Sequence, residues 1–475
     1  MLWLIATMVG VTILGLAILG GITRVFGVPD GYLDPISAMM LRCEEEAINT
    51  IHICAQLESR VSVGTFTPLF ASAFVSRHAR MQERVVMPWL GWPYWERIPA
   101  STFDVSSHIR APLGEDSTLS HAQLEAQVSA LLGSPLPLDA PLWDVSVFYM
   151  ETGHTAFVFR VHHALGDGVT LARMFFAGLQ NVVSPFGAAQ QSRPRRVRPA
   201  REPRSASSLL RELPTALRSL VFSAEDPPSP FKRAHGDGIT PHGERVCALA
   251  TVEGLELDDV KAAASRLGVT VNDVLLAGLS GVLRLQAIDG GVEHPNSIRT
   301  VLWVSLQSLR AMYLPLEADP LPEWGNRRLG FVYVTLPLDE PDPVERARII
   351  HAETARLLHS PMAILGGWLM HILGLLPGPI LRAFWPYIAF KVTMSMSNMP
   401  GPAGPVTLGG IPVTSVAFFV PPQGRVGLFA TLYTMNGHIG FGLAADKRIA
   451  GQETMESGVH SRFMACLPLH PGASS

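Results

Sequence analysis

The sequence predicts an α+β fold built from two domains. The chain has 475 residues, which is enough for two domains that each bury a core. Strand and helix patterns are mixed without the regular strand–helix–strand rhythm of a doubly wound sheet. A segment rich in proline, serine, alanine, glycine and arginine runs from Ser184 to His242. We therefore expect an N-terminal domain over 31–183, a linker over 184–242 and a C-terminal domain over 243–470.

Helix and strand signals follow one another in the C-terminal domain. Arg245–Val252 is expected to form a strand, and Asp258 to cap a helix that ends near Gly268. Thr270 or Asn272 is expected to cap the next helix, which presents small residues for close packing. Further strands are expected between glycine and proline turns at Val301–Leu306, Phe331–Leu336, Val413–Val420, Leu428–Thr434 and His438–Ala444.

The overall composition excludes several classes of protein. Hydrophobic residues make up 48% of the chain and charged residues 16%, a balance that excludes a mainly disordered protein. A formal net charge of -3 argues against a nucleic-acid binder, which would be distinctly basic. The four cysteines are scattered and form no CxxC pair. This spacing predicts neither a disulfide framework nor a zinc site, and it is typical of a reducing compartment.

The N-terminus predicts a membrane anchor. Leu2 to Ile22 contains no charged residue, and a helix of that length spans roughly 32 Å, about one bilayer core. A cleaved signal peptide is the alternative, but the stretch has no positive n-region and exceeds the usual apolar length of roughly 7–15 residues. We expect an uncleaved, single-pass signal anchor over residues 1–24. Arg24 and Arg42 follow the span, which places the body of the protein in the cytosol.

Two other segments bear on membrane contact. The apolar stretch from Pro361 to Phe390 is interrupted by prolines and carries His371 and Arg382, which are costly in lipid. It is expected to form a pair of buried or amphipathic helices, with a shallow dip into the membrane interface as the alternative. The linker holds eight arginines between Arg193 and Arg218. It is either a solvated tether or a segment attracted to an anionic leaflet.

Candidate catalytic residues lie between an alternating strand pattern at 156–161 and an apolar helical pattern at 169–176. The string between them reads HHALGDG, from His162 to Gly168. Loops of this kind present reactive groups on a rigid scaffold. An imidazole titrates near neutrality, so it can take a proton from a hydroxyl and return it to a leaving group. Asp167 can fix the loop through an ion pair, and the glycines permit close backbone approaches.

Two other interpretations of this loop were weighed. A histidine pair at the end of a strand can be merely structural, but the complete HHxxxDG string between strand and helix favours a catalytic role. A metal site is not expected, because His162 and His163 point to opposite faces of an extended chain and no third ligand lies at HExxH spacing.

The HHxxxDG string resembles the active-site motif of CoA-dependent acyltransferases and peptide-synthetase condensation domains. The wider sequence resembles the wax ester synthase/diacylglycerol acyltransferase family, and the matching strings occur in the family's order over roughly residues 60–450. These strings are PLWDV at 141–145, HHALGDG at 162–168, TVNDVLLAGLSGVLR at 270–284, GN at 325–326, DPVER at 342–346, SNMPGP at 397–402 and NGHIGFGLAADK at 436–447.

The resemblance implies two chloramphenicol-acetyltransferase-like domains with a tunnel at their interface. By this analogy His163 is the general base and His162 supports its position. Asp167 is structural and pairs with an arginine, for which Arg80 and Arg84 are the candidates. The family usually shows Ser-Leu-Arg where this chain has SLQ at 305–307, which leaves the role of that arginine open.

Further residues are implied near the substrate. Gly168 belongs to the motif, Asn272 begins a helix beside the site, and Asn398, Pro400 and Gly401 line the tunnel. SNMPGP read by itself is also compatible with a Pro-Gly turn that leads into strands after Val406.

The function implied is a membrane-bound, acyl-CoA-dependent O-acyltransferase. It would esterify long-chain fatty alcohols, diacylglycerol or both, with acyl-CoA as co-substrate and with no further cofactor, no metal and no nucleic acid. The single apolar span makes the endoplasmic reticulum the expected location, with the lipid droplet as the alternative. Two alternatives stay open: the same chemistry on a sterol or short alcohol, and a non-catalytic lipid-binding membrane protein.

Overall fold

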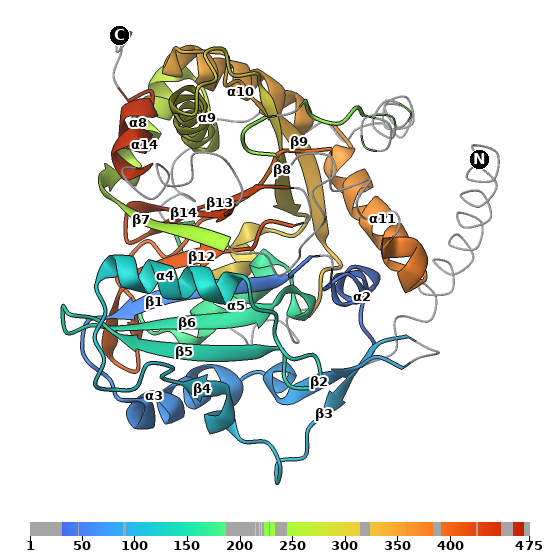
Figure 1. The fold of residues 1–475 in the computed structure, drawn as a ribbon, viewed down its shortest axis with the longest axis vertical. Helices are drawn as coiled ribbons and strands as arrows, with labels where there is room; N and C mark the ends of the chain where they lie inside the picture. The colour runs from blue at the N-terminus through green and yellow to red at the C-terminus, as the bar shows by residue number, and fades with distance from the viewer. Residues whose placement is uncertain are drawn as a thin grey trace.

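The computed structural model describes residues 31–45, 47–88, 92–186, 245–313, 324–358, 360–382, 391–423, 426–447 and 459–469, with short pieces between 214 and 232. Within these residues the chain forms two six-stranded sheets and one two-stranded sheet, covered by helices (Figure 1). The expected α+β class is confirmed. The expected anchor at 1–24 and most of the linker at 184–242 lie outside the described residues.

The first large sheet belongs mainly to the N-terminal half. Its strand order is β11 (Thr407–Leu408), β12 (Ile411–Phe419), β1 (Thr50–Leu57), β6 (Thr155–His162), β5 (Trp143–Tyr149) and β4 (Ile109–Arg110). Every pair is antiparallel except β4 with β5. β5 and β6 are buried along their full length, which accounts for their nearly continuous apolar sequence. β6 therefore holds its C-terminal end, where the histidine pair lies, in the interior.

Helices and a hairpin complete this half of the molecule. They are α2 (Pro35–Arg42), α3 (Val63–Phe70), a π-helix at Ala71–Val75, α4 (His121–Leu132), α5 (Gly168–Gly178), and the hairpin of β2 (Glu83–Val86) with β3 (Tyr94–Arg97). Short 3-10 turns cover Ala79–Gln82, Val105–His108 and His163–Leu165. An aromatic cluster fills the core beside α3, in which Phe70 lies 4.7–5.7 Å, ring to ring, from Phe66, Phe74, Trp143 and Phe159.

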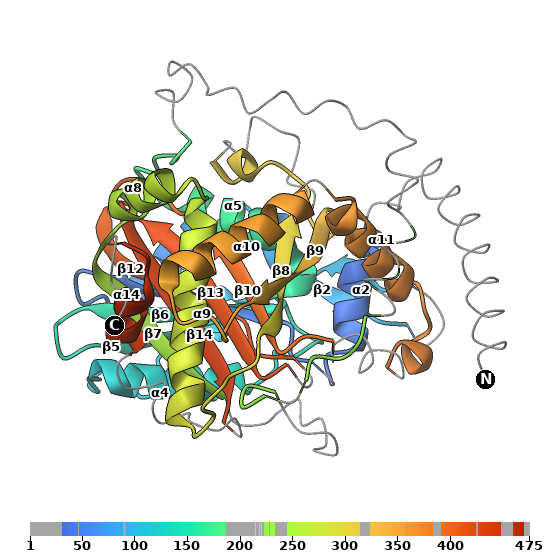
Figure 2. The ribbon, with the colours of Figure 1, turned by 90° about the horizontal axis from the view of Figure 1, so that it is seen from above.

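The second large sheet belongs to the C-terminal half. Its order is β7 (Arg245–Glu256), β14 (His438–Asp446), β13 (Leu428–Met435), β10 (Met394–Met399), β8 (Ile298–Ser305) and β9 (Leu329–Leu336). The remaining helices are α8 (Leu257–Leu267), α9 (Val271–Asp289), a 3-10 turn at Leu309–Tyr313, α10 (Pro343–Leu358), α11 (Met362–Gly374) and α14 (Val459–Cys466). Figure 2 shows α9 and α10 lying across one face of this sheet.

The local signals of the C-terminal half are largely confirmed. Thr270 caps α9 through a capping box, and Gly268 ends α8 in the left-handed conformation. The prediction that Asp258 caps α8 is wrong, because the helix begins at Leu257, after Glu256. Asp258 lies in the first turn, where its negative charge interacts favourably with the helix dipole. Strand β10 was not predicted. Its sequence MSMSN gives little strand signal, and its central, parallel position in the sheet decides its conformation.

The C-terminal part of the chain contributes two strands to the N-terminal sheet. β11 and β12 come from the C-terminal part of the chain, yet β12 pairs with β1 in the N-terminal sheet, with His52 opposite Phe419. The side chain of Thr431 on β13 also donates a hydrogen bond to the carbonyl of Phe418, which ties the exchanged strand back to the C-terminal sheet. The predicted division of the chain at residue 243 therefore does not coincide with the division between the sheets over 407–419.

The second apolar stretch, Pro361–Phe390, begins with α11. Leu365, Met370 and Leu373 on this helix are buried, while Ile364 and Trp368 are exposed, so the helix is apolar on its exposed side as well and is neither fully buried nor amphipathic. Residues 383–390 lie outside the described part. Among the described helices, α9 alone is by itself long and apolar enough to cross a bilayer, but 72% of its apolar window is buried inside the protein. α9 is therefore a core helix.

We expect Phe70→Ala to destabilise the N-terminal half by about 3–5 kcal/mol, because it removes the ring that four aromatic neighbours contact and leaves a cavity. Chemical denaturation followed by tryptophan fluorescence measures the shift. Leu285→Ala is the matched control, since Leu285 is 37% exposed and should change stability little. A Phe70→Ala midpoint equal to that of the control would contradict this account of the core.

Candidate active site

The HHxxxDG loop bridges the two halves of the molecule. β6 ends at His162, a 3-10 turn covers His163–Leu165, and Asp167 caps α5 by accepting a hydrogen bond from Thr170 N at 2.8 Å. Gly325, from the C-terminal half, donates its N–H to Leu165 O at 2.8 Å and accepts from Asp167 N at 3.2 Å. The loop thus forms a short parallel bridge to the opposite lobe, with Gly166 facing Gly325.

His163 is held in place by two backbone hydrogen bonds. Its N–H donates to Asn49 O at 2.7 Å, and its carbonyl accepts from Asn326 Nδ2 at 2.7 Å. The side chain is partly exposed, and no hydrogen bond to its buried Nδ1 is formed by the described residues. Burial lowers the pKa of His163, and His162 adds to that effect, while Asp167 opposes it. The ring is therefore neutral at neutral pH and can accept a proton.

His162 is fully buried and bonded on both ring nitrogens. Its Nδ1 accepts from Ala164 N at 3.0 Å, and its Nε2 lies 3.0 Å from Glu44 Oε2. Because Nδ1 accepts, the ring proton is assigned to Nε2, which donates to Glu44. Glu44 also accepts from Asn49 N at 2.9 Å. In this geometry His162 holds the loop in place and its two nitrogens are not available to a substrate.

Asp167 is bound by neutral donors, and the expected ion pair with Arg80 or Arg84 is wrong. Gln307 Nε2 lies 3.1 and 3.0 Å from the two carboxylate oxygens, and Ser305 Oγ donates to Oδ2 at 3.2 Å. Both arginines are committed to local pairs around the β2–β3 hairpin, Arg80 with Glu83 at 2.5 Å and Arg84 with Glu96 at 2.6 Å.

The departure from the family's Ser-Leu-Arg string is therefore explained. Ser305 is the last residue of β8, Gln307 follows two residues later, and both side chains face Asp167. The amide of Gln307 therefore serves as a hydrogen-bond donor to this buried carboxylate. Arg310 is exposed and lies over the ring of Phe186 instead. The loop is thus anchored to the C-terminal sheet by hydrogen bonds rather than by an ion pair with an arginine.

Gly325 and Asn326 connect the loop to α2. Asn326 N donates to Asp34 Oδ2 at 3.0 Å, and Asn326 Nδ2 contacts both Ser37 Oγ and the His163 carbonyl. Gly325 has a φ of 98°, and a Cβ there would collide with the carboxylate of Asp34. Only glycine meets both requirements, which accounts for the Gly-Asn string.

Asn272 and Asn398 lie next to each other. Asn398 Nδ2, at the end of β10, donates to Asn272 Oδ1 in the first turn of α9 at 2.9 Å. Among the described residues, no hydrogen bond joins this pair to either histidine. Asp273 has a structural role, because it completes the cap of α9 and accepts hydrogen bonds from His351 and Thr354 on α10.

The SNMPGP segment runs beside α5. Met399 Sδ lies 3.4 Å from the position a Cβ would take on Gly168, so the end of β10 reaches the start of α5. Pro400 O accepts a hydrogen bond from Tyr313 at 2.7 Å, and Gly401 N donates to Thr434 Oγ1 at 3.1 Å. A Cβ on Gly401 would overlap the carbonyl of Thr434, so this close approach requires glycine.

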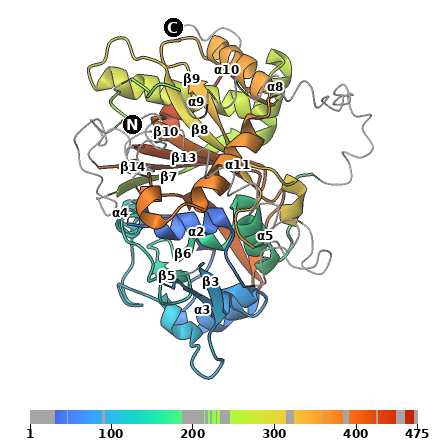
Figure 3. The same cartoon turned by 90° about the vertical axis from the view of Figure 1, so that its right-hand side faces the viewer.

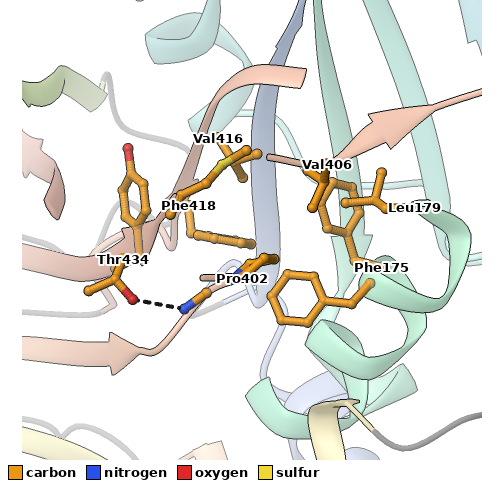
Figure 4. A pocket seen from close by; sticks show the side chains of 11 residues that line it. Phe175, Leu179, Pro402, Val406, Val416, Phe418 and Thr434 are labelled. Carbon is orange, nitrogen blue, oxygen red and sulfur yellow. Dashed lines mark hydrogen bonds between the residues drawn. The ribbon is translucent and has the colours of Figure 1, made fainter. Parts of the chain in front are cut away.

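An apolar pocket lies at the far end of α5. It is a small recess, partly open to solvent, and its walls come from α5, the SNMPGP segment, β12 and β13 (Figure 4). The lining side chains carry no charge. They are Phe175, Phe176, Leu179, Gly401, Pro402, Val406, Val416, Phe418, Tyr433, Thr434 and Met435. α5 thus connects a polar end, where Asp167 and the histidines lie, with an apolar end suited to hydrocarbon.

Sequence analysis missed three side chains at this site: Glu44, Asn49 and Asp34. Glu44 reaches His162 from 118 residues away, and nothing in the local sequence marks any of the three. The SLQ string marked Ser305, but its contact with Asp167, 138 residues away, was not predicted. Among the described residues no group of three or more His, Cys, Asp or Glu side chains could hold a metal ion.

The fold resembles that of several acyl-transferring proteins of known structure. A wax ester synthase/diacylglycerol acyltransferase from Marinobacter aquaeolei has 19% identity and a TM-score of 0.63, covering 92% of this chain and 99% of that one. The first condensation domain of the calcium-dependent antibiotic synthetase has 15% identity and a TM-score of 0.56, covering 94% of this chain and 98% of that one. Fold and loop together define a two-lobed protein of the HHxxxDG class.

The family is shown by sequence. Residues 33–275 match the wax ester synthase/diacylglycerol acyltransferase catalytic domain, and residues 324–457 match the C-terminal domain of the same family. The chain belongs to this family of acyltransferase enzymes, as the motifs predicted. Wax ester synthase/diacylglycerol acyltransferase 4 of Arabidopsis thaliana is 24% identical over 425 residues, which is 80% of this chain and 79% of the relative. A provisionally named diacylglycerol O-acyltransferase of Mycobacterium tuberculosis is 26% identical over 394 residues, 75% and 72% of the two chains.

We expect Gln307→Leu to lower stability by about 1.5–3 kcal/mol, because it removes the amide that donates to both oxygens of the buried Asp167 carboxylate. Chemical denaturation measures this loss. Gln307→Arg, which restores donors to the carboxylate, should recover most of it, whereas Gln307→Glu should be worse than leucine because it opposes two negative charges. A leucine variant as stable as the parent would refute this assignment of Gln307.

Proposed function

We propose that this protein is an acyl-CoA-dependent O-acyltransferase that esterifies long-chain fatty alcohols, diacylglycerol or both, to wax esters and triacylglycerol. The observation that carries the proposal is the His163 ring, which is neutral, partly exposed and free of a protein hydrogen-bond partner at its buried nitrogen. Membership of the family supports the reaction class, and the names of the relatives support both acceptors.

In the proposed mechanism His163 is the general base. Its neutral imidazole takes the proton of the acceptor hydroxyl as the oxygen attacks the thioester carbonyl carbon. The tetrahedral intermediate collapses, the carbon–sulfur bond breaks, and the protonated imidazole returns its proton to the departing CoA thiolate. The products are an ester and free CoA, so the chemistry uses acyl-CoA as co-substrate and consumes no further cofactor.

The other site residues serve this base indirectly. His162, held by Glu44, fixes the backbone from which His163 projects, and Asp167 positions the start of α5 beside Gly168. The Asn272–Asn398 pair, with Pro400 and Gly401 beyond it, is proposed to line the path of the substrate from the loop toward the apolar pocket. An acyl or alkyl chain placed there would be shielded from water.

Membrane attachment is part of the proposal. Long-chain acceptors partition into lipid, and the uncharged segment from Leu2 to Ile22 suits a membrane anchor. We propose a single-pass protein of the endoplasmic reticulum with the two-lobed body in the cytosol, where acyl-CoA is available. Sterols and short alcohols are alternative acceptors that the same base would serve.

The first test replaces the base. Membranes that carry the full chain, or its His163→Ala variant, receive labelled palmitoyl-CoA with either hexadecanol or diacylglycerol. We expect ester formation and CoA release to fall by roughly 10²–10⁴-fold in the variant, the contribution of a positioned base. His121→Ala is the matched control, since His121 is exposed on α4 and pairs with Glu125 at 3.7 Å. Full activity of His163→Ala would refute the mechanism, and no ester with either acceptor would refute the proposed substrates.

The second test is the pH dependence. Because burial lowers the pKa of His163, the acidic limb of kcat/KM should lie below the usual value of about 6.5 for histidine. As the pH falls through that lowered pKa the base becomes protonated, so kcat/KM should fall about tenfold per pH unit and stay level above it. An acidic limb centred above 6.5 would contradict a desolvated His163 as the base.

A further inference from the structure

α11 presents an exposed apolar face on the surface of the molecule. Trp368 is 59% exposed and Ile364, one turn earlier, is 49% exposed, whereas Leu365 and Met370 on the other side are buried. Trp368 is the most exposed large hydrophobic side chain among the described residues. Figure 3 looks onto this helix, which lies on the outside of the molecule next to α2. Single exposed hydrophobic residues are normal, but two large ones one turn apart on the outer side of an apolar helix form a patch.

The loop after β8 extends the same face. Leu306 is 41% exposed, and its Cδ1 lies 3.6 Å from the position a Cβ would take on Gly367, the residue before Trp368. The backbone N–H of Leu306 donates to Arg328 O, and both Arg327 and Arg328 are exposed. We call Ile364, Trp368 and Leu306, with these two arginines, the α11 surface. It combines apolar side chains with positive charge at its edge.

We propose that the α11 surface docks onto a lipid bilayer that contains anionic phospholipids. The sequence that precedes the first described residue supports a lipid bilayer as the partner. The uncharged segment Leu2–Ile22 ends only nine positions before the first described residue, Gly31, and α2 begins four positions after Gly31. A membrane anchor in that segment would therefore hold α2 close to the lipid.

α2 is itself attached to the end of α11. Arg42 donates to the carbonyls of Gly374 at 3.2 Å and Leu376 at 3.5 Å, and Gly374 packs against the backbone of Pro35 so closely that a Cβ would collide with it. α11 therefore lies on the side of the fold at which the apolar segment joins it. An indole favours the bilayer interface, and arginines near it favour anionic headgroups, so the chemistry of the surface matches that position.

Docking in this way would bring the catalytic loop next to the lipid. Leu306 lies between Ser305 and Gln307, the two residues that hydrogen-bond Asp167, so one short segment contacts both the loop and the α11 surface. An acceptor dissolved in the bilayer would then have a short route to His163. This consequence rests on the proposed function, whereas the docking itself does not.

The test measures local depth rather than binding of the whole chain. The full-length protein with Ile364→Cys, carrying an environment-sensitive NBD label, is placed in vesicles of phosphatidylcholine and phosphatidylserine. The control is Ala262→Cys on α8, an exposed position at the opposite end of the molecule (Figure 1). The unsubstituted chain, treated identically, corrects for reaction at native cysteines. We expect nitroxide-labelled lipid to quench the label at 364 several-fold more than at 262, and aqueous iodide to quench it several-fold less.

A second variant checks that the α11 surface is responsible. Trp368→Glu should reduce lipid quenching at position 364 several-fold, whereas Ile349→Glu, at an exposed position on α10, should leave it unchanged. Iodide quenching at 364 equal to that at 262 would show that the face stays in water and would overturn the proposal. Shielding of the label from both quenchers would also overturn it, because the face would then be covered by protein, either residues 1–30 or a second copy of the chain. Loss of ester synthesis with the depth signal intact would refute the proposed function alone.

Discussion

The short backbone bridge between Gly325 and the HHxxxDG loop is the contact on which the rest of the site depends. Two hydrogen bonds, to Leu165 and from Asp167, join a loop of the N-terminal sheet to a turn of the C-terminal sheet. Asn326 then holds the carbonyl of His163 and reaches α2 through Ser37 and Asp34. The His163 loop is carried by one lobe and oriented by the other, so its geometry exists only when both lobes are folded and in contact. The exchange of β11 and β12 stabilises that same relation between the sheets.

Electrostatics at the loop are arranged by burial and neutral donors. The only carboxylates bonded to it are Glu44, which meets the N–H of His162, and Asp167, which meets an amide, a hydroxyl and a backbone N–H in the described residues. A positive partner at Asp167 would weaken the negative potential that this carboxylate provides near His163. With Gln307 in that position, Asp167 still raises the pKa of His163 against the larger, opposite effect of burial. Burial thus lowers the pKa of the His163 ring while Asp167 limits the decrease, a balance that would suit the proposed general base.

Two segments connect the HHxxxDG loop to apolar parts of the structure. α5 leads from the loop to an uncharged pocket, and the β8 segment leads from the same loop to the exposed leucine beside α11. The proposed long-chain substrate would need both an interior that excludes water and a surface from which it can enter from lipid. α11 turns apolar side chains outward and α9 lies mostly in the core, although both helices are strongly apolar in sequence.

The sequence by itself determined the α+β class, the place of the HHxxxDG loop between a strand and a helix, and the family, because these are recorded in local patterns: alternation before His162, helical spacing after Gly168, and short strings in a fixed order. It also determined the end of α8 at Gly268 and narrowed the cap of α9 to Thr270 or Asn272, of which the structure has Thr270. Only the tertiary structure decided that Glu44 supports His162 and that Gln307, not Arg80 or Arg84, holds Asp167. Glu44 lies 118 residues from His162 in the sequence, and Gln307 lies 140 residues from Asp167. Arg80 and Arg84 instead pair with Glu83 and Glu96 at the β2–β3 hairpin. β10 is explained in the same way, since a central parallel strand is stabilised by its neighbours in the sheet and needs little strand propensity of its own.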